Sequence, residues 1–175
     1  MEIKDFTKNV LSDIRVDLTE EFDRNFERKG FFTNKWRGTN LPNRRGSLMM
    51  RTGNLRRSIR SKQSSNEITW SSSLPYASIN NEGGEIVVTD KMKRFFWAMY
   101  YKASGAAKGK GERAQRLTAE AQQWKNLALQ KVGAKMKIEQ RQFIGDHPIV
   151  RQRIEEIVDK NIKELQDHIY NQLKK

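Results

Sequence analysis

The sequence contains no cysteine and only two histidines. The absence of thiols excludes a disulfide scaffold, thiolate metal sites and thiol catalysis, and it leaves the redox compartment undetermined. Two histidines leave few ways to form a hydrolytic triad. Long apolar runs are also missing, because nowhere do about eighteen apolar residues follow one another and no apolar run follows a basic start at the N-terminus. We therefore expect a soluble protein without a secretion signal and without a membrane contact.

Length and composition fit a single domain over residues 1–175. Hydrophobic residues make up 36% of the chain, and six Met, eight Phe and four Trp supply bulky side chains. This is enough apolar material for a modest core, so we expect the chain to fold despite its strong charge.

The net charge of +13 is concentrated in two blocks. Residues 28–63 contain eleven Lys and Arg and no acidic residue, and residues 91–136 contain eleven basic and two acidic residues. The rest of the chain carries a net negative charge. Two basic blocks within an acidic frame indicate contact with acidic surfaces of nucleic acid or protein, and solvated basic faces are the alternative.

Apolar residues at steps of three and four predict a long amphipathic helix at each end of the chain. The first covers residues 2–28 and ends at Gly30. The last follows "DHP", where Asp146 or His147 is the expected cap and Pro148 lies in the first turn. Between the helices, residues 31–50 predict a loop that is anchored by Phe31, Phe32 and Trp36.

Short extended runs predict strands in the middle of the chain. Residues 58–62 and 67–72 flank a small polar turn and predict a hairpin, with Ile68 and Trp70 on the same face. Residues 85–89 and the run "KIEQRQFIG" read as further extended segments. Together with the two long helices, these runs predict an α+β domain with a small, mainly antiparallel sheet packed by the terminal helices.

The basic segment 91–136 predicts a helical hairpin inserted between strands. One apolar face contains Phe95, Phe96, Met99 and Ala103, and the other contains Leu117, Ala121, Trp124 and Ala128. The sequence "SGAAKGKG" between them predicts a flexible tip.

Residues that could carry catalysis or hold a metal are few. His147 and His168 have no carboxylate at the spacing of a helical metal pair, and "GKGER" lacks the spacing of a phosphate-binding loop. The acidic residues between 13 and 23 lie along one helix that already has an apolar stripe, which favours a solvated acidic face over a nuclease metal site. We predict that the protein is not an enzyme and needs no cofactor or metal.

Three short runs, "RTGNLRRSI", "YASINNEGG" and "QRQFIG", lie in this order between the two long helices. In this order the chain resembles the phage virion morphogenesis family of tail-completion and neck proteins. That family has an Arg/Thr-Gly-x-Leu-x-x-Ser-Ile run, a Tyr-Ala segment ending in Gly-Gly and an Arg-x-Phe-Ile/Leu-Gly run before its last helix. The matching motif residues are Arg51, Thr52, Gly53, Leu55, Ser58, Ile59, Tyr76, Ala77, Gly83, Gly84, Arg141, Phe143, Ile144 and Gly145.

The physical roles of the motif residues are those of a scaffold. Gly53 permits a sharp turn before a strand, after which Leu55 and Ile59 enter the core. Arg56 and Arg57 then remain at the rim. The Gly-Gly pair permits a tight reversal, and the phenylalanine of the third run closes the sheet just before the last helix.

The resemblance implies a structural virion protein at the head-tail junction, assembled in the host cytoplasm. It implies a ring, a hexamer, that docks to portal or connector proteins and to tail-tube or tail-terminator proteins. Contact with packaged DNA stays open. The chain departs from the typical pattern by the insertion at about 91–136, which leaves the exact surface and partner open.

Expected interface residues lie in the two basic blocks, because loops and basic segments can become ordered on docking to acidic surfaces. They are Trp36, Arg44, Arg45, Arg56, Arg57, Phe95, Phe96, Met99, Lys108 and Lys110. The alternative function is a nucleic-acid-binding module, in which residues 28–63 and 91–136 neutralise phosphates while aromatic residues stack on bases.

Overall fold

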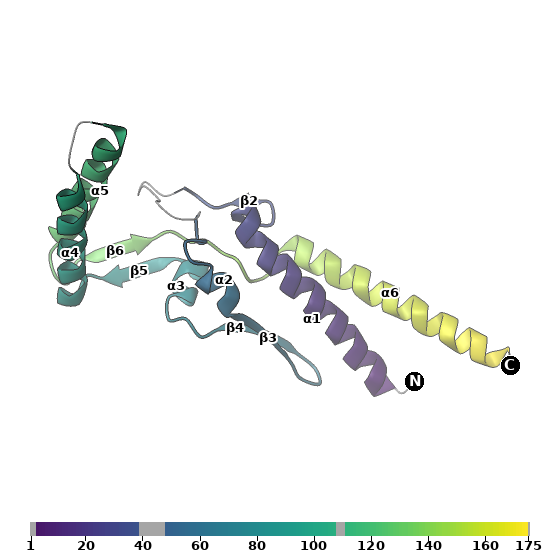
Figure 1. Ribbon diagram of the computed structural model, residues 1–175. Helices are drawn as coiled ribbons and strands as arrows, with labels where there is room; N and C mark the ends of the chain where they lie inside the picture. The colour runs from purple at the N-terminus through teal and green to yellow at the C-terminus, as the bar shows by residue number, and fades with distance from the viewer. Residues whose placement is uncertain (1–2, 39–47, 108–110, 175) are drawn as a thin grey trace.

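The computed structural model describes residues 3–38, 48–107 and 111–174, and it confirms an α+β fold. Two long helices, α1 (Ile3–Arg28) and α6 (Pro148–Leu173), lie side by side and run in opposite directions (Figure 1). The start of α1 and the end of α6 are therefore at the same end of the molecule. The end of α1 at Arg28 and the start of α6 at Pro148 agree with the predictions.

The main core forms where the apolar stripe of α1 meets α6 and a β-hairpin. Val10, Ile14, Leu18 and Phe22 are buried together with Val150 of α6. The predicted hairpin is formed by β3 (Ile59–Gln63) and β4 (Ile68–Ser72), and its Ile68 and Trp70 pack against this core from one face, as expected. The apolar stripe of α1 is therefore covered by α6 and by the β3–β4 hairpin.

The acidic residues of α1 lie mostly in ion pairs and hydrogen bonds within the chain. Asp17 accepts hydrogen bonds of 2.7 and 2.6 Å from Arg153 of α6, and Asp13 accepts one of 3.0 Å from Asn161. The expectation of a solvated acidic face was thus wrong for this side of α1. Asp13, Asp17 and Glu21 join the two long helices, because each contacts a cation or an amide of α6.

Glu21 is the most buried of these acids, with a side chain only 4% exposed. Burial by itself would raise its pKa, but hydrogen bonds from Arg28 and Arg24 and the charge of Arg153 outweigh it, so the pKa lies below the ordinary value of 4.5. A lowered pKa in the folded state means that the carboxylate stabilises the fold above about pH 4.5. This stabilisation is lost as the pH falls through the folded-state pKa.

We expect Glu21→Gln to lower the free energy of unfolding at pH 7 by about 1–3 kcal/mol, because charge-assisted hydrogen bonds are lost. The difference between variant and parent should shrink as the pH falls from the ordinary value of 4.5 through the lowered pKa of Glu21, because the carboxylate becomes protonated there. Urea unfolding at a series of pH values measures both effects. A difference that stays constant down to pH 2 would show that the carboxylate charge does not matter.

The segment after α1 is a short hairpin rather than a loop throughout. Lys29 adopts a positive φ of 53° and ends the helix, and β1 (Gly30–Phe31) pairs with β2 (Asn34–Lys35). Phe31 and Phe32 are buried, as their role as anchors predicts. Part of the predicted loop, residues 39–47, lies outside the described residues, and so do the expected interface residues Arg44 and Arg45.

The described strands form three separate two-stranded antiparallel sheets. Besides the two hairpins, β5 (Gly84–Val87) pairs with β6 (Lys135–Ile138), with Ile86 opposite Met136. Two short helices, α2 (Asn54–Ser58) and α3 (Ala77–Glu82), lie between these strands along the chain. The strands are antiparallel as expected, but the single sheet is divided because helices and turns separate its strand pairs.

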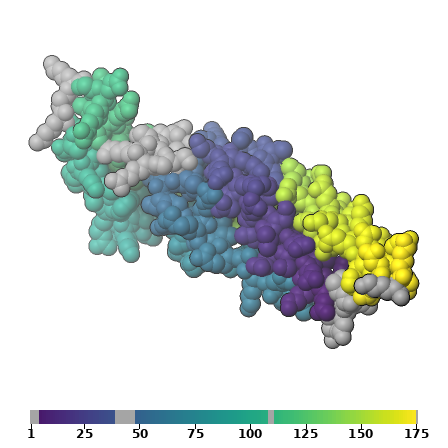
Figure 2. All heavy atoms as spheres, turned by 45° about the vertical axis from the view of Figure 1, so that its right-hand side comes forward, coloured from purple at the N-terminus to yellow at the C-terminus, as the bar shows by residue number. Residues whose placement is uncertain are grey.

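The basic insertion is a helical hairpin, as predicted. It consists of α4 (Asp90–Ala106) and α5 (Glu112–Ala128), which pack along each other. The ribbon β5–β6 carries this pair at the end of the molecule opposite the chain termini (Figures 1 and 2). No helix in the described ranges is long and apolar enough to cross a membrane.

Candidate functional site

The three motif runs, which are separated by up to 90 residues in the chain, meet around one small core. Leu55 of the first run, Ala77 of the second and Phe143 of the third are buried together with Phe26 of α1. Ile59 and Ile144 pack against the same cluster. The three runs, which lie apart along the sequence, therefore meet at one place in the fold.

The turn at Gly53 has the predicted conformation, with a φ of 71°. The residue that follows begins the one-turn helix α2 rather than a strand, and this corrects the prediction of a turn directly before a strand. Thr52 Oγ1 accepts a hydrogen bond of 3.3 Å from the backbone N–H of Asn54. A β-carbon at Gly53 would also lie 2.9 Å from the guanidinium of Arg57.

We expect Gly53→Ala to lower the free energy of unfolding by about 1–3 kcal/mol, because an L side chain is strained at this φ. Gly38→Ala is the matched control, since a β-carbon there meets no atom within 4 Å and its φ is not in the strained range. Thermal or urea unfolding of both variants measures the difference. Equal stability of the two variants would mean that the left-handed turn is not required.

Two asparagines hold the third motif run in place. Asn25 Nδ2 donates a hydrogen bond of 3.2 Å to the carbonyl of Phe143, and Asn81 Oδ1 accepts from the N–H groups of Phe143 and Ile144 at 2.9 and 3.1 Å. Phe143 is therefore not part of a sheet, which corrects that prediction. Side-chain amides take the role that a neighbouring strand would have. The sequence pattern does not single out either asparagine, because an isolated polar residue in a helix carries no local signal.

The Gly-Gly pair makes the predicted reversal. Gly83 and Gly84 have φ values of 72° and 136° and connect α3 to β5. The backbone N–H of Arg141 donates a hydrogen bond of 2.7 Å to the carbonyl of Asn80, so the third run passes directly beside α3. This contact brings Arg141 next to the residues of the first two runs.

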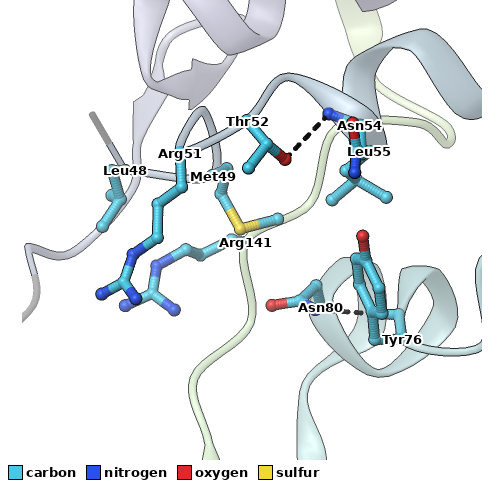
Figure 3. A pocket seen from close by; sticks show the side chains of 9 residues that line it. All are labelled: Leu48, Met49, Arg51, Thr52, Asn54, Leu55, Tyr76, Asn80 and Arg141. Atoms are coloured by element: carbon cyan, nitrogen blue, oxygen red, sulfur yellow. Dashed lines mark hydrogen bonds between the residues drawn. The ribbon is translucent and has the colours of Figure 1, made fainter. Parts of the chain in front are cut away.

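A pocket of about 450 Å³ opens beside this core. Its lining comes from all three motif runs and consists of Leu48, Met49, Arg51, Thr52, Asn54, Leu55, Tyr76, Asn80 and Arg141 (Figure 3). Among the described residues, the lining includes two arginines and no acidic residue. In Figure 3 the side chains of Arg51 and Arg141 extend in the same direction, away from Leu55. The pocket is therefore open, partly apolar and positively charged.

Three other expected interface residues of the first basic block are engaged within the chain. Trp36 packs edge-on against Phe26 and donates its indole N–H to the carbonyl of Gln142 at 2.6 Å. Arg56 forms ion pairs with Asp23 and Glu27 of α1, and the carboxylate of Asp23 raises the pKa of its guanidinium. Trp36 and Arg56 thus stabilise the fold itself, and because both are half-buried their place in an interface stays a prediction. Arg57 is exposed as predicted and bonds to Thr52 and Asn54.

The aromatic residues of the insertion divide between two faces of α4. Phe96 is only 7% exposed and stacks on Trp124 of α5, so its assignment to an interface was wrong. Phe95 is 54% exposed and Tyr101 is 65% exposed, and Tyr101 lies in a ring cluster with Trp97 and Tyr100.

Met99 is half-buried, so its proposed place in an interface stays a prediction. The remaining expected interface residues, Lys108 and Lys110, lie outside the described residues.

Neither histidine lies in a metal or catalytic cluster of the described structure. His147 caps α6, because its Nδ1 accepts a hydrogen bond of 3.2 Å from the N–H of Ile149, and His168 contacts Gln172 on the exposed end of that helix. Within residues 3–38, 48–107 and 111–174, no three His, Asp or Glu side chains stand close enough to hold a metal ion. The structure decides that His147, and not Asp146, is the cap.

Comparison of the chain with protein-family models, with curated proteins and with solved structures found no match.

Proposed function

We propose that this protein is a structural protein of the phage virion that acts at the head-tail junction during tail completion. It would assemble as a six-fold ring and dock to portal or connector proteins and to tail-tube or tail-terminator proteins. One observation supports this most strongly: the three motif runs that carry the family resemblance come together around one core and one pocket.

The position of the insertion agrees with a docking function. The hairpin α4–α5 is at one end of the molecule (Figure 2). Its Phe95 and Tyr101 are exposed, and so are the basic residues Lys91, Arg94 and Lys102 of the same helix. Exposed aromatic residues rimmed by cations are typical of an interface for another protein. The hairpin has its own packed interior around Phe96, so it can present this face without losing its fold.

Mass measurement and negative-stain electron microscopy of the purified protein test the ring. We expect a closed oligomer of six subunits at micromolar concentration. Phe95→Ser combined with Tyr101→Ser should leave the fold intact and weaken ring formation or docking, because exposed aromatic anchors contribute much of the binding energy. Leu129→Ser, at a 60% exposed position after α5, is the control. A chain that stays monomeric at every concentration and docks to no connector protein would contradict the proposal.

The alternative, a nucleic-acid-binding module, is supported by the ring cluster of α4. Trp97 and Tyr101 stack with centroids 6.0 Å apart, and Lys93 and Lys102 lie on the same helix. Aromatic rings beside cations are able to stack on bases and neutralise phosphates. Tight DNA binding with a steep salt dependence would favour this alternative, whereas weak and salt-labile binding agrees with a virion protein.

A further inference from the structure

The pocket beside the core around Phe26 contains two cationic side chains, Arg51 and Arg141, that have no anionic partner among the described residues. Neither Arg51 nor Arg141 forms an ion pair within the described parts of the chain, and no Asp or Glu lines the pocket. Some other partly buried arginines of the molecule have carboxylate partners, as Arg56 has Asp23 and Arg153 has Asp17. The pair in the pocket is therefore free to bind an anion from outside the chain.

Arg141 is also incompletely satisfied in its hydrogen bonds. Its Nε is buried without a hydrogen-bond partner, and its guanidinium makes one long contact of 3.5 Å, to the carbonyl of Arg37. A buried donor without an acceptor is unfavourable, whereas charge-assisted bonds from a guanidinium to a carboxylate or phosphate are strong and often bidentate. An anion in the pocket would accept hydrogen bonds from the other N–H groups of Arg141 and from Arg51.

The rest of the lining indicates which other groups of a ligand would lie beside the anion. Leu48, Met49, Leu55 and Tyr76 make an apolar part of the pocket, which suits an aliphatic or aromatic side chain beside the charged group. Asn80 uses its Nδ2 to donate to the carbonyl of Tyr76 at 2.6 Å, so its Oδ1 remains an acceptor at the pocket (Figure 3). A peptide backbone supplies an N–H donor for this oxygen.

We propose that this pocket binds an acidic peptide segment of a partner protein. A carboxylate would bond to Arg51 and Arg141, a neighbouring apolar side chain would fill the part lined by Leu55 and Tyr76, and a backbone N–H would bond to Asn80. The pocket volume of about 450 Å³ holds a few side chains rather than a nucleic-acid track. Nucleic acid needs a longer row of cations along its backbone, and among the described residues two cations line this pocket. The inference rests on the proposed docking function and identifies the chemistry of the partner.

Fluorescence anisotropy with a labelled peptide of alternating leucine and aspartate tests the proposal on the whole chain. The same peptide with asparagine in place of aspartate measures the contribution of charge, and single-stranded DNA of similar length measures phosphate binding. The pocket variant is Arg51→Gln with Arg141→Gln. The control is Arg94→Gln with Arg113→Gln, which removes the same charge from exposed positions of α4 and α5.

We expect the pocket variant to bind the acidic peptide at least about tenfold more weakly than the parent and the control to differ by less than about twofold. Arg51→Gln alone should lose part of the affinity for the acidic peptide. Because the Arg51 side chain is exposed, this single variant should remain folded, so it tests the pocket even if the double variant unfolds. Equal losses in pocket and control variants, or equal binding of both peptides, would overturn the proposal. A loss of DNA binding without a loss of peptide binding would assign the pocket to phosphate instead. The titration does not depend on ring formation, so failure of the ring and failure of the pocket are distinguishable.

Discussion

Phe26→Ala is expected to lower the free energy of unfolding by about 3–5 kcal/mol, which is a large part of the stability of a typical domain. Phe26 is 0% exposed, and its ring lies 5.1 Å from that of Phe143 and 5.8 Å from that of Trp36. Removing the ring would leave a cavity where the last turns of α1, the segment after β2 and the third motif run meet. Because these parts are far apart in sequence, little local structure can collapse to fill it.

Urea unfolding followed by tryptophan fluorescence measures this effect. Val16→Ala is the matched control, because Val16 is on the same helix and 58% exposed, and it should change the stability by less than about 0.5 kcal/mol. The pocket beside the motif core should be affected as well, so the Phe26 variant should bind the acidic peptide more weakly. A stability loss below about 1 kcal/mol would show that the small core around Phe26 is not packed as described.

Asn25→Leu is expected to lower the free energy of unfolding by about 2–5 kcal/mol, because it leaves two buried backbone groups without partners. Asn25 is 0% exposed, donates to the carbonyl of Phe143 and accepts a hydrogen bond of 3.0 Å from the N–H of Phe32. Leucine has a similar size but makes neither bond. The loss should therefore arise from unsatisfied polar groups rather than from a change in volume.

Asn9→Leu is the control for this substitution, since Asn9 is exposed on the same helix. It should leave the stability within about 0.5 kcal/mol of the parent. Hydrogen exchange provides a second measurement, because the amide of Phe32 should exchange faster in the Asn25 variant than in the parent. Unchanged protection of that amide would contradict the role of Asn25 as its acceptor.

Local patterns in the sequence were sufficient to predict most elements of the fold. The apolar period of α1 and α6, the alternation in β3–β4 and the two helical faces of the insertion all describe contacts whose geometry repeats every few residues. The turn at Gly53 was predictable for the same reason, because the need for a positive φ is a property of one residue. These features depend on the backbone geometry and on residues only a few positions apart in the sequence.

The partner of each surface was decided only by the tertiary structure. The sequence shows that α4 has an apolar face, but only its packing on α5 shows that Phe96 is covered by Trp124 while Tyr101 is left exposed. In the same way, Arg56 is charged in any conformation, and its pairing with Asp23 depends on the approach of α2 to α1.

The candidate site is the clearest case. Arg51 and Arg141 are 90 positions apart, and they line one pocket because Asn25 and Asn81 hold the third motif run against α1 and α3. Those hydrogen bonds join residues 118 and 62 positions apart, and no local periodicity encodes such a separation. The sequence by itself therefore determined the helices, the turns and the apolar faces, because these follow from local geometry. Only the tertiary structure decided which polar groups meet, since that depends on long-range packing.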